Sequence, residues 1–161
     1  MALEVHQFPC LGDNYGFLVH DPETGATASI DSPEADRINA ALEHKGWRLT
    51  HILNTHHHFD HAGGNEELKA QWNATVVGAD CDAARIPGID VRVVDGETYT
   101  FGSSTAQVIE TPGHTSGHVS YYFADDHIAF VGDTLFVLGC GRLFEGTPEQ
   151  MWNSLSKLMA L

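Results

Sequence analysis

The sequence predicts a layered α/β domain with helices on the outside, and two observations lead to this prediction. Short apolar runs bounded by turn residues recur along the chain, which is typical of strands. Stretches with helical periodicity interrupt these runs near both ends of the chain. Because no repeat or linker divides the 161 residues, we expect one domain over residues 1–161, with packed sheets covered by helices.

The N-terminal half predicts a hairpin followed by alternating helices and strands. Residues 15–20 and 27–31 are apolar runs on either side of the turn sequence DPETG, which indicates a hairpin. Ser32 and Pro33 have the pattern of a helix cap followed by proline, so a helix is expected from there to about Lys45. The remaining candidates are strands at 51–54 and 75–77 and a helix at 65–72.

The C-terminal half predicts strands and then a capped helix. Turns at Asp95-Gly96 and Asp125-Asp126 separate the apolar runs. The sequence TPEQ has the capping-box pattern, with Thr147 as the cap and Gln150 reaching back to it. The apolar face of this helix is predicted to hold Met151, Leu155, Leu158 and Met159. The strand candidates are residues 91–94, 99–101, 105–109, 119–123 and 127–131.

The composition excludes several classes of function. The 22 acidic and 8 basic residues give a net charge of −14, which repels phosphate groups, so neither nucleic acid nor a membrane is expected as a partner. The N-terminus lacks the basic and apolar regions of a secretory signal. Three widely spaced cysteines, Cys10, Cys81 and Cys140, form no disulfide framework. We therefore expect a cytoplasmic protein, and no protein partner is evident.

The segment NTHHHFDHAGGN contains a candidate metal site. Just beyond a strand, an extended chain points alternate side chains the same way, so His56, His58 and Asp60 are expected on one side and His57 on the other. Imidazole and carboxylate groups are common ligands of zinc and similar ions. The spacing suits two neighbouring ions, one held by His56 and His58 and the other by Asp60 and His61. A solvated polar loop is the alternative.

Two later segments offer further ligands. ETPGHTSGH places His114 after a strand and a Pro-Gly turn, where it can be a third ligand of the first ion. FVGDTLF places Asp133 directly after an apolar strand, and a carboxylate in that position can bridge two ions through its two oxygens. Each residue could instead serve only its turn.

These motifs, in this order, resemble the metallo-β-lactamase superfamily. The runs THHHFDH and TPGHTSGH, followed by GDTLF and GCGRLFEGT, resemble within it the glyoxalase II (hydroxyacylglutathione hydrolase) family over essentially the whole chain. The resemblance implies an αββα sandwich with a two-metal site at one edge. It implies two divalent ions, expected to be zinc, with iron or manganese possible. The implied ligands are His56, His58 and His114 for the first ion, Asp60 and His61 for the second, and Asp133 for both.

The resemblance also implies a reaction and residues that support it. A metal-bound hydroxide, oriented by Asp60, would attack the thioester of S-lactoylglutathione to give D-lactate and glutathione. Arg142 would lie near glutathione and pair with a carboxylate, with a surface arginine of the loop as the alternative. Phe144 stands where some members have a tyrosine. Asp31 resembles an aspartate that buttresses the metal loop, with helix capping as the alternative. His118 is expected to shape the HTSGH turn.

In the glyoxalase II family, a further histidine ligand and a helical substrate-binding domain follow the last helix of this chain. We therefore expect the chain to be truncated, the second half of the sandwich to lack its end, and the second ion to lack one ligand. Three alternatives to the thioester hydrolase remain. They are a persulfide dioxygenase with one iron, an impaired metal-binding fragment, and a hydrolase of lactones or β-lactams.

Overall fold

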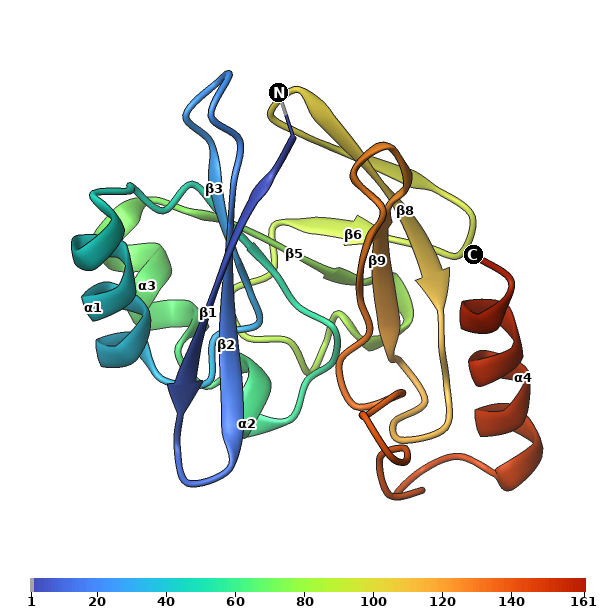
Figure 1. The fold of residues 1–161 in the computed structure, drawn as a ribbon. Coiled ribbons are helices and arrows are strands. Elements are labelled where there is room, and N and C mark those ends of the chain that lie inside the picture. Colours follow the sequence, from blue (N-terminus) through green and yellow to red (C-terminus); the bar gives the residue numbers. More distant parts are fainter. Residues whose placement is uncertain (1) are drawn as a thin grey trace.

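The computed structural model describes residues 2–161, whose strands form a six-stranded and a four-stranded sheet (Figure 1). The larger sheet contains, in spatial order, β1 (Glu4–Cys10), β2 (Asn14–His20), β3 (Thr27–Ile30), β4 (His51–Leu53), β5 (Thr75–Ala79) and β6 (Val91–Val93). The smaller sheet contains β10 (Ile128–Phe130), β9 (Val119–Phe123), β8 (Ser104–Glu110) and β7 (Thr98–Phe101). Neighbouring strands of the smaller sheet are all antiparallel.

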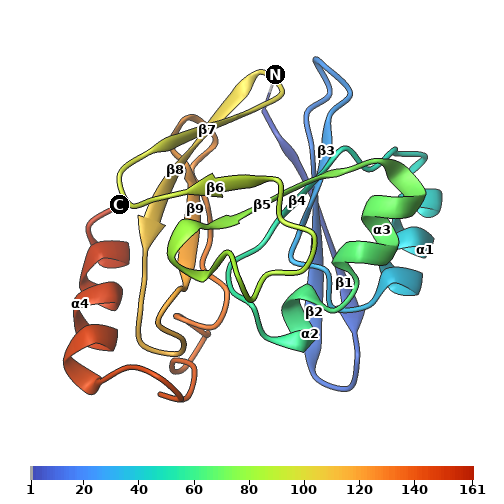
Figure 2. The same ribbon diagram turned by 180° about the vertical axis from the view of Figure 1, so that it is seen from behind.

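Helices cover the outer faces of both sheets. The helices are α1 (Ala35–Lys45), α2 (Phe59–Ala62), α3 (Asn65–Trp72) and α4 (Pro148–Met159), with 3-10 turns η1 (Asp80–Asp82) and η2 (Ala124–Asp126). Helices α1 and α3 lie against the larger sheet, and α4 lies on the far side of the smaller sheet (Figures 1 and 2). The layered α/β domain predicted from the sequence pattern is therefore confirmed, as is the αββα sandwich implied by the resemblance. Within residues 2–161, every helix is too short or too polar to traverse a bilayer.

The central strands of the larger sheet are buried on both faces. Ile52 and Val76 belong to the apolar cluster between this sheet and α1 and α3, whereas Leu53 and Val77 belong to the cluster between the sheets. Successive side chains of a strand point to opposite faces, so each of these strands contributes to both clusters. Tyr121 and other side chains of the smaller sheet complete the inner cluster.

The parallel part of the larger sheet determines where polar residues collect. Strands β3, β4 and β5 run parallel, so their carboxyl ends lie at the same edge. Asp31 follows β3 directly, and the histidine segment follows β4. Ligand sites in such sheets form outside the carboxyl ends of the strands. The fold therefore brings two distant polar segments together at this edge.

The predicted hairpin and capping box are confirmed, but the start of the first helix was wrong. Helix α1 begins at Ala35, with Glu34 at the cap position and no capping side chain. Ser32 is buried, and its hydroxyl donates to Asn65 Oδ1 at 2.5 Å. The serine therefore joins the histidine segment to the chain after β3 and does not cap the helix. Strand β1, which was not predicted, is an edge strand that includes Pro9.

Two further expectations about local structure are corrected. Asp60 does not continue an extended chain from His58, because α2 begins at Phe59 and turns the carboxylate by helical geometry. In α4, Met159 is 68% exposed and does not belong to the buried face. Ser154 is buried instead, and its hydroxyl is satisfied there because it donates to the carbonyl of Pro112 at 2.7 Å.

Candidate metal centre

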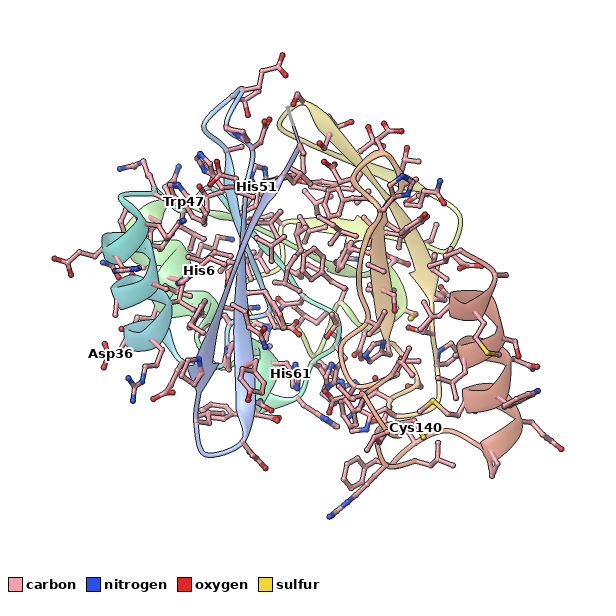
Figure 3. The ribbon with its side chains drawn as sticks, in the orientation of Figure 1. His6, Asp36, Trp47, His51, His61 and Cys140 are labelled. Carbon is pink, nitrogen blue, oxygen red and sulfur yellow. The ribbon has the colours of Figure 1, made fainter. Side chains whose placement is uncertain are left out.

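Three loops bring the predicted ligands together at one end of the two sheets. The segment after β4 carries four histidines, and His114 and Asp133 follow β8 and β10 of the smaller sheet. His61 lies between the two halves of the molecule, at the end where the turn between β1 and β2 also lies (Figure 3). Both sheets thus contribute to one polar centre.

His56, His58 and His114, here called the first group, converge through one nitrogen each. His58 Nδ1 lies 3.2 Å from His56 Nε2 and 3.0 Å from His114 Nε2. The three ligand nitrogens all lie within 4.8 Å of one another. Nitrogens bound tetrahedrally to zinc stand roughly 3.3 Å apart. The donor set and spacing of the first group therefore fit a zinc-like ion.

The outer nitrogens of two histidines of the first group, His56 and His114, are held by the protein. His114 Nδ1 donates to the carbonyl of Arg142 at 2.7 Å, which leaves the lone pair on Nε2, facing the other histidines. His56 Nδ1 lies 3.0 Å from the hydroxyl of Thr55. Such partners fix the ring orientation of a metal ligand. Burial, followed by the neighbouring imidazoles, lowers the pKa of His56 and of His58, so both rings are neutral at pH 7.

The second group consists of Asp60, His61 and Asp133, and its two carboxylates flank the buried Nε2 of His61. His61 Nε2 lies 3.2 Å from Asp133 Oδ1 and 3.6 Å from Asp60 Oδ2. It makes no well-formed hydrogen bond within residues 2–161, although it is buried. A buried polar atom usually has a partner. A nitrogen left in this way beside two carboxylates fits a position for a cation.

Asp133 stands between the two groups. Its Oδ1 faces His61, and its Oδ2 lies 3.3 Å from His114 Nε2. Burial opposes ionisation of this carboxyl, but His61 and the other nearby histidines outweigh it and lower the pKa of Asp133. The preceding Gly132 has φ 47°, and a Cβ there would collide with His118 and Thr55. The glycine is therefore needed for the close approach of this loop.

Asp31 supports the histidine segment and does not cap helix α1. Its Oδ1 accepts from the Thr55 amide at 2.7 Å, and its Oδ2 accepts from the Thr55 hydroxyl and from His61 Nδ1, both at 2.8 Å. These contacts hold Asp31 in the left-handed region at φ 59°, which aspartate tolerates better than most residues. Burial favours a neutral His61, but Asp31 and Asp133 prevail and raise its pKa to about 10.

Two histidines near the groups serve other contacts. His118 is fully buried; its Nε2 accepts from the Asp133 amide at 3.1 Å, and its Nδ1 lies 2.9 Å from the Thr111 hydroxyl. Burial lowers the pKa of His118 to about 3, so the ring is neutral. His57 points to Asp82, with Nδ1 2.8 Å from its Oδ2.

An open cleft of about 440 Å³ gives access to both groups. Its lining residues are His58, Phe59, Asp60, His114, Asp133 and Phe144. The ring centroid of Phe144 lies 5.3 Å from that of His114 and 5.7 Å from that of His58. The side chain of Arg142 is exposed, and its carbonyl orients His114.

Asn14 contacts a predicted ligand, but none of the sequence motifs includes it. Asn14 is the first residue of β2, next to the turn from β1, and its side-chain amide donates to the Asp60 carbonyl at 3.1 Å and to Asp60 Oδ2 at 3.2 Å. It lies 46 positions from Asp60 in the chain, and only the pairing of β1 with β2 places it there. No local pattern could have linked the two residues.

Comparisons with known proteins agree with this architecture. Residues 23–161 match the model of the metallo-β-lactamase superfamily. A hydroxyacylglutathione hydrolase of Maricaulis maris is 60% identical over 159 residues, and one of Methylococcus capsulatus is 58% identical. Each match covers 99% of this chain, which spans 62% of the length of those relatives.

Two solved structures show the same fold. The crystal structure of ETHE1 from Myxococcus xanthus is 31% identical with a TM-score of 0.80, and the match covers 99% of this chain and 70% of that one. The crystal structure of TTHA1623 in a di-iron-bound form is also 31% identical with a TM-score of 0.80, over 96% of this chain and 86% of that one. The family model, the fold and the convergent histidines agree, and the chain belongs to the metallo-β-lactamase superfamily.

Proposed function

We propose that this chain carries the catalytic centre of a hydroxyacylglutathione hydrolase, which converts S-lactoylglutathione and water to D-lactate and glutathione. The observation that carries the proposal is the pair of ligand groups joined by Asp133 and open to one cleft. The names of the most similar relatives support the substrate class. TTHA1623, which was solved with two irons, supports a two-ion centre in this fold.

The residues of the two groups have distinct proposed roles. The first group would hold one ion, Asp60 and His61 would hold the second, and Asp133 would contact both. Bound divalent cations lower the pKa of water to about 7 and offset negative charge that develops on the thioester. We assign zinc to both positions, because imidazole and carboxylate ligands suit it.

The protein side chains would position the reactants. Asp60, held by Asn14, would accept a hydrogen bond from the attacking water and so orient it toward the acyl carbon. Phe144 would lie along the acyl group in the cleft. The exposed guanidinium of Arg142 would pair with a carboxylate of glutathione. The net charge of −14 disfavours an anionic substrate, and two bound cations would offset it locally.

The test combines metal analysis with hydrolysis of S-lactoylglutathione by zinc-reconstituted protein. His56→Ala is expected to bind less zinc and to lose more than about 100-fold in kcat/KM, because a direct ligand matters more than its outer partners. His44→Ala, at an exposed position of α1, is the matched control and should leave both values unchanged. Equal hydrolysis by His56→Ala and the control would refute the proposal. Zinc binding without any hydrolysis would indicate an impaired metal-binding protein instead.

Oxidation of glutathione persulfide at a single iron is the second candidate. His58, His114 and Asp133 lie close enough to form a set of two histidines and one carboxylate, which is the ligand set of many iron oxygenases. One iron per chain, with oxygen uptake in the presence of glutathione persulfide, would favour this activity over thioester hydrolysis.

A further inference from the structure

Asp82 is a buried carboxylate that belongs to neither ligand group. Its side chain is 1% exposed and lies in η1, after β5. Oδ2 contacts His57 Nδ1 at 2.8 Å, and Oδ1 accepts from the Nε of Arg85. A carboxylate withdrawn from water needs such partners. Asp82 thus connects Arg85 to His57, which lies between His56 and His58 in the histidine segment.

Arg85 continues this connection to two other loops. Its Nη1 contacts Glu145 Oε1 at 2.5 Å, and its Nη2 contacts Glu145 Oε2 at 3.1 Å, a forked pairing that restricts the angle of both groups. Nη2 also lies 3.2 Å from the Ser116 hydroxyl. Glu145 Oε2 in turn accepts from the Ser116 amide at 2.7 Å and from its hydroxyl at 2.8 Å.

The same residues are packed closely as well as hydrogen-bonded. A Cβ on Gly117 would collide with the side chain of Asp82, so the loop after His114 touches the carboxylate directly. His57 Nε2 lies 3.9 Å from Glu145 Oε1, which brings the two ends of the network together. Three segments that carry site residues therefore meet here: the histidine segment, the loop of His114, and the loop of Phe144.

We propose that Asp82, Arg85 and Glu145 form a positioning clamp that sets the distance between the two loops of the first group. The three histidines come from loops of different sheets, and a metal site needs its ligands placed before the ion binds. Arg85 acts through the loops and contacts no ligand. The inference rests on the proposed metal centre, but it requires no particular substrate.

The test uses zinc alone, titrated into metal-free protein against a chromophoric chelator. Arg85→Met and Glu145→Gln are each expected to raise the dissociation constant of the first zinc about 10-fold. The double variant should lose little more than either single one, because both changes break the same link. The visible absorption of cobalt(II)-loaded Arg85→Met should also differ from that of the unaltered protein.

Arg92→Met is the matched control. Arg92 pairs with Asp80 at 3.7 Å on the surface, next to the clamp but without contact to a ligand loop. A first-zinc dissociation constant for Arg85→Met within about twofold of the control would overturn the clamp, since the ligand loops would then keep their spacing without Arg85. A lower unfolding midpoint with unchanged zinc affinity and cobalt spectrum would overturn it too.

Glu145→Gln keeps the side-chain volume and the contacts of Asp82, so it decides the question if Arg85→Met does not fold. Because no thioester is used, the clamp and the proposed function are judged separately. Weakened zinc binding in a protein that hydrolyses no thioester would support the clamp and count against the function. Hydrolysis by the unaltered protein, with unchanged zinc affinity in the variants, would support the proposed function and count against the clamp.

Discussion

The two ligand groups lie side by side but differ in charge. The first group consists of imidazoles, and burial lowers the pKa of His56 and His58, so these rings are neutral at pH 7. The second group places two carboxylates around His61, whose pKa is raised to about 10 despite burial. At neutral pH and without metal, His61 therefore carries a proton and a positive charge.

This difference has consequences for metal binding. Neutral imidazoles offer their lone pairs directly, whereas a protonated histidine must release its proton before it binds an ion. The first position is therefore expected to fill before the second and with less dependence on pH. In the metal-free protein, the proton on His61 offsets part of the negative charge of Asp31 and Asp133. Without metal, the His61 imidazolium thus provides positive charge next to the carboxylates of the second group.

The largest expected effect is that of Asp31→Asn on the metal-free protein. The change removes one negative partner of the buried His61 imidazolium and weakens the hydrogen bonds to Thr55. We expect the free energy of unfolding at pH 7 to fall by about 3 kcal/mol, which is typical when one partner of a buried ion pair is lost. Urea denaturation measures this.

Asp125→Asn, at an exposed position of η2, is the control and should change the free energy of unfolding by less than about 0.5 kcal/mol. The comparison between the groups requires the loss in Asp31→Asn to shrink at high pH, where His61 is neutral. A loss that is equally large at about pH 10.5, beyond the pKa of His61, would assign it to hydrogen bonds instead of charge.

The stability of the metal-free protein should fall as the pH rises from about 7 to about 10. His61 has a higher pKa in the folded protein than its ordinary value of 6.5, so protonation favours the folded state. Its contribution is fully present below pH 6.5 and is lost as the pH rises through about 10. Denaturation across this range should show a shallower decline in His61→Gln. An equally shallow decline in His56→Gln would contradict the contrast between the groups.

The smallest expected effect is that of Asn14→Ala, which should separate the two positions. Asn14 holds the 49%-exposed side chain of Asp60, so its loss should weaken binding of the second zinc about 10-fold and leave the first unchanged. Calorimetric titration with zinc resolves the two steps. Asn39→Ala, which removes a similar amide bond to Gln71 on the surface, is the control. Equal weakening of both steps would show that Asn14 supports the whole centre.

Apart from β1, the strands and the position of the histidine segment could be predicted because their signals are local. Apolar runs, turn residues and the capping box at Thr147 each depend on a few neighbouring positions. Asp60 could not be placed in the same way. The alternation of an extended chain predicted its direction, but α2 begins at Phe59 and the segment folds back to Ser32. The Ser32 amide donates to the His61 carbonyl, and the Ser32 carbonyl accepts from the Gly64 amide. The contact of Ser32 with Asn65 likewise replaced its predicted role as a cap.

The sequence by itself determined the chemical types of the candidate ligands, the order of the motifs and a layered α/β domain with helices on the outside, since these follow from residue identity and periodicity. Only the tertiary structure decided which atoms meet. Asp133 faces both His61 and His114 because two sheets end at the same edge. Asn14 contacts Asp60, and Arg85 contacts Ser116 in the loop of His114, although each pair is far apart in the chain. Contacts of this kind depend on the packing of whole elements, and no short stretch of sequence encodes them.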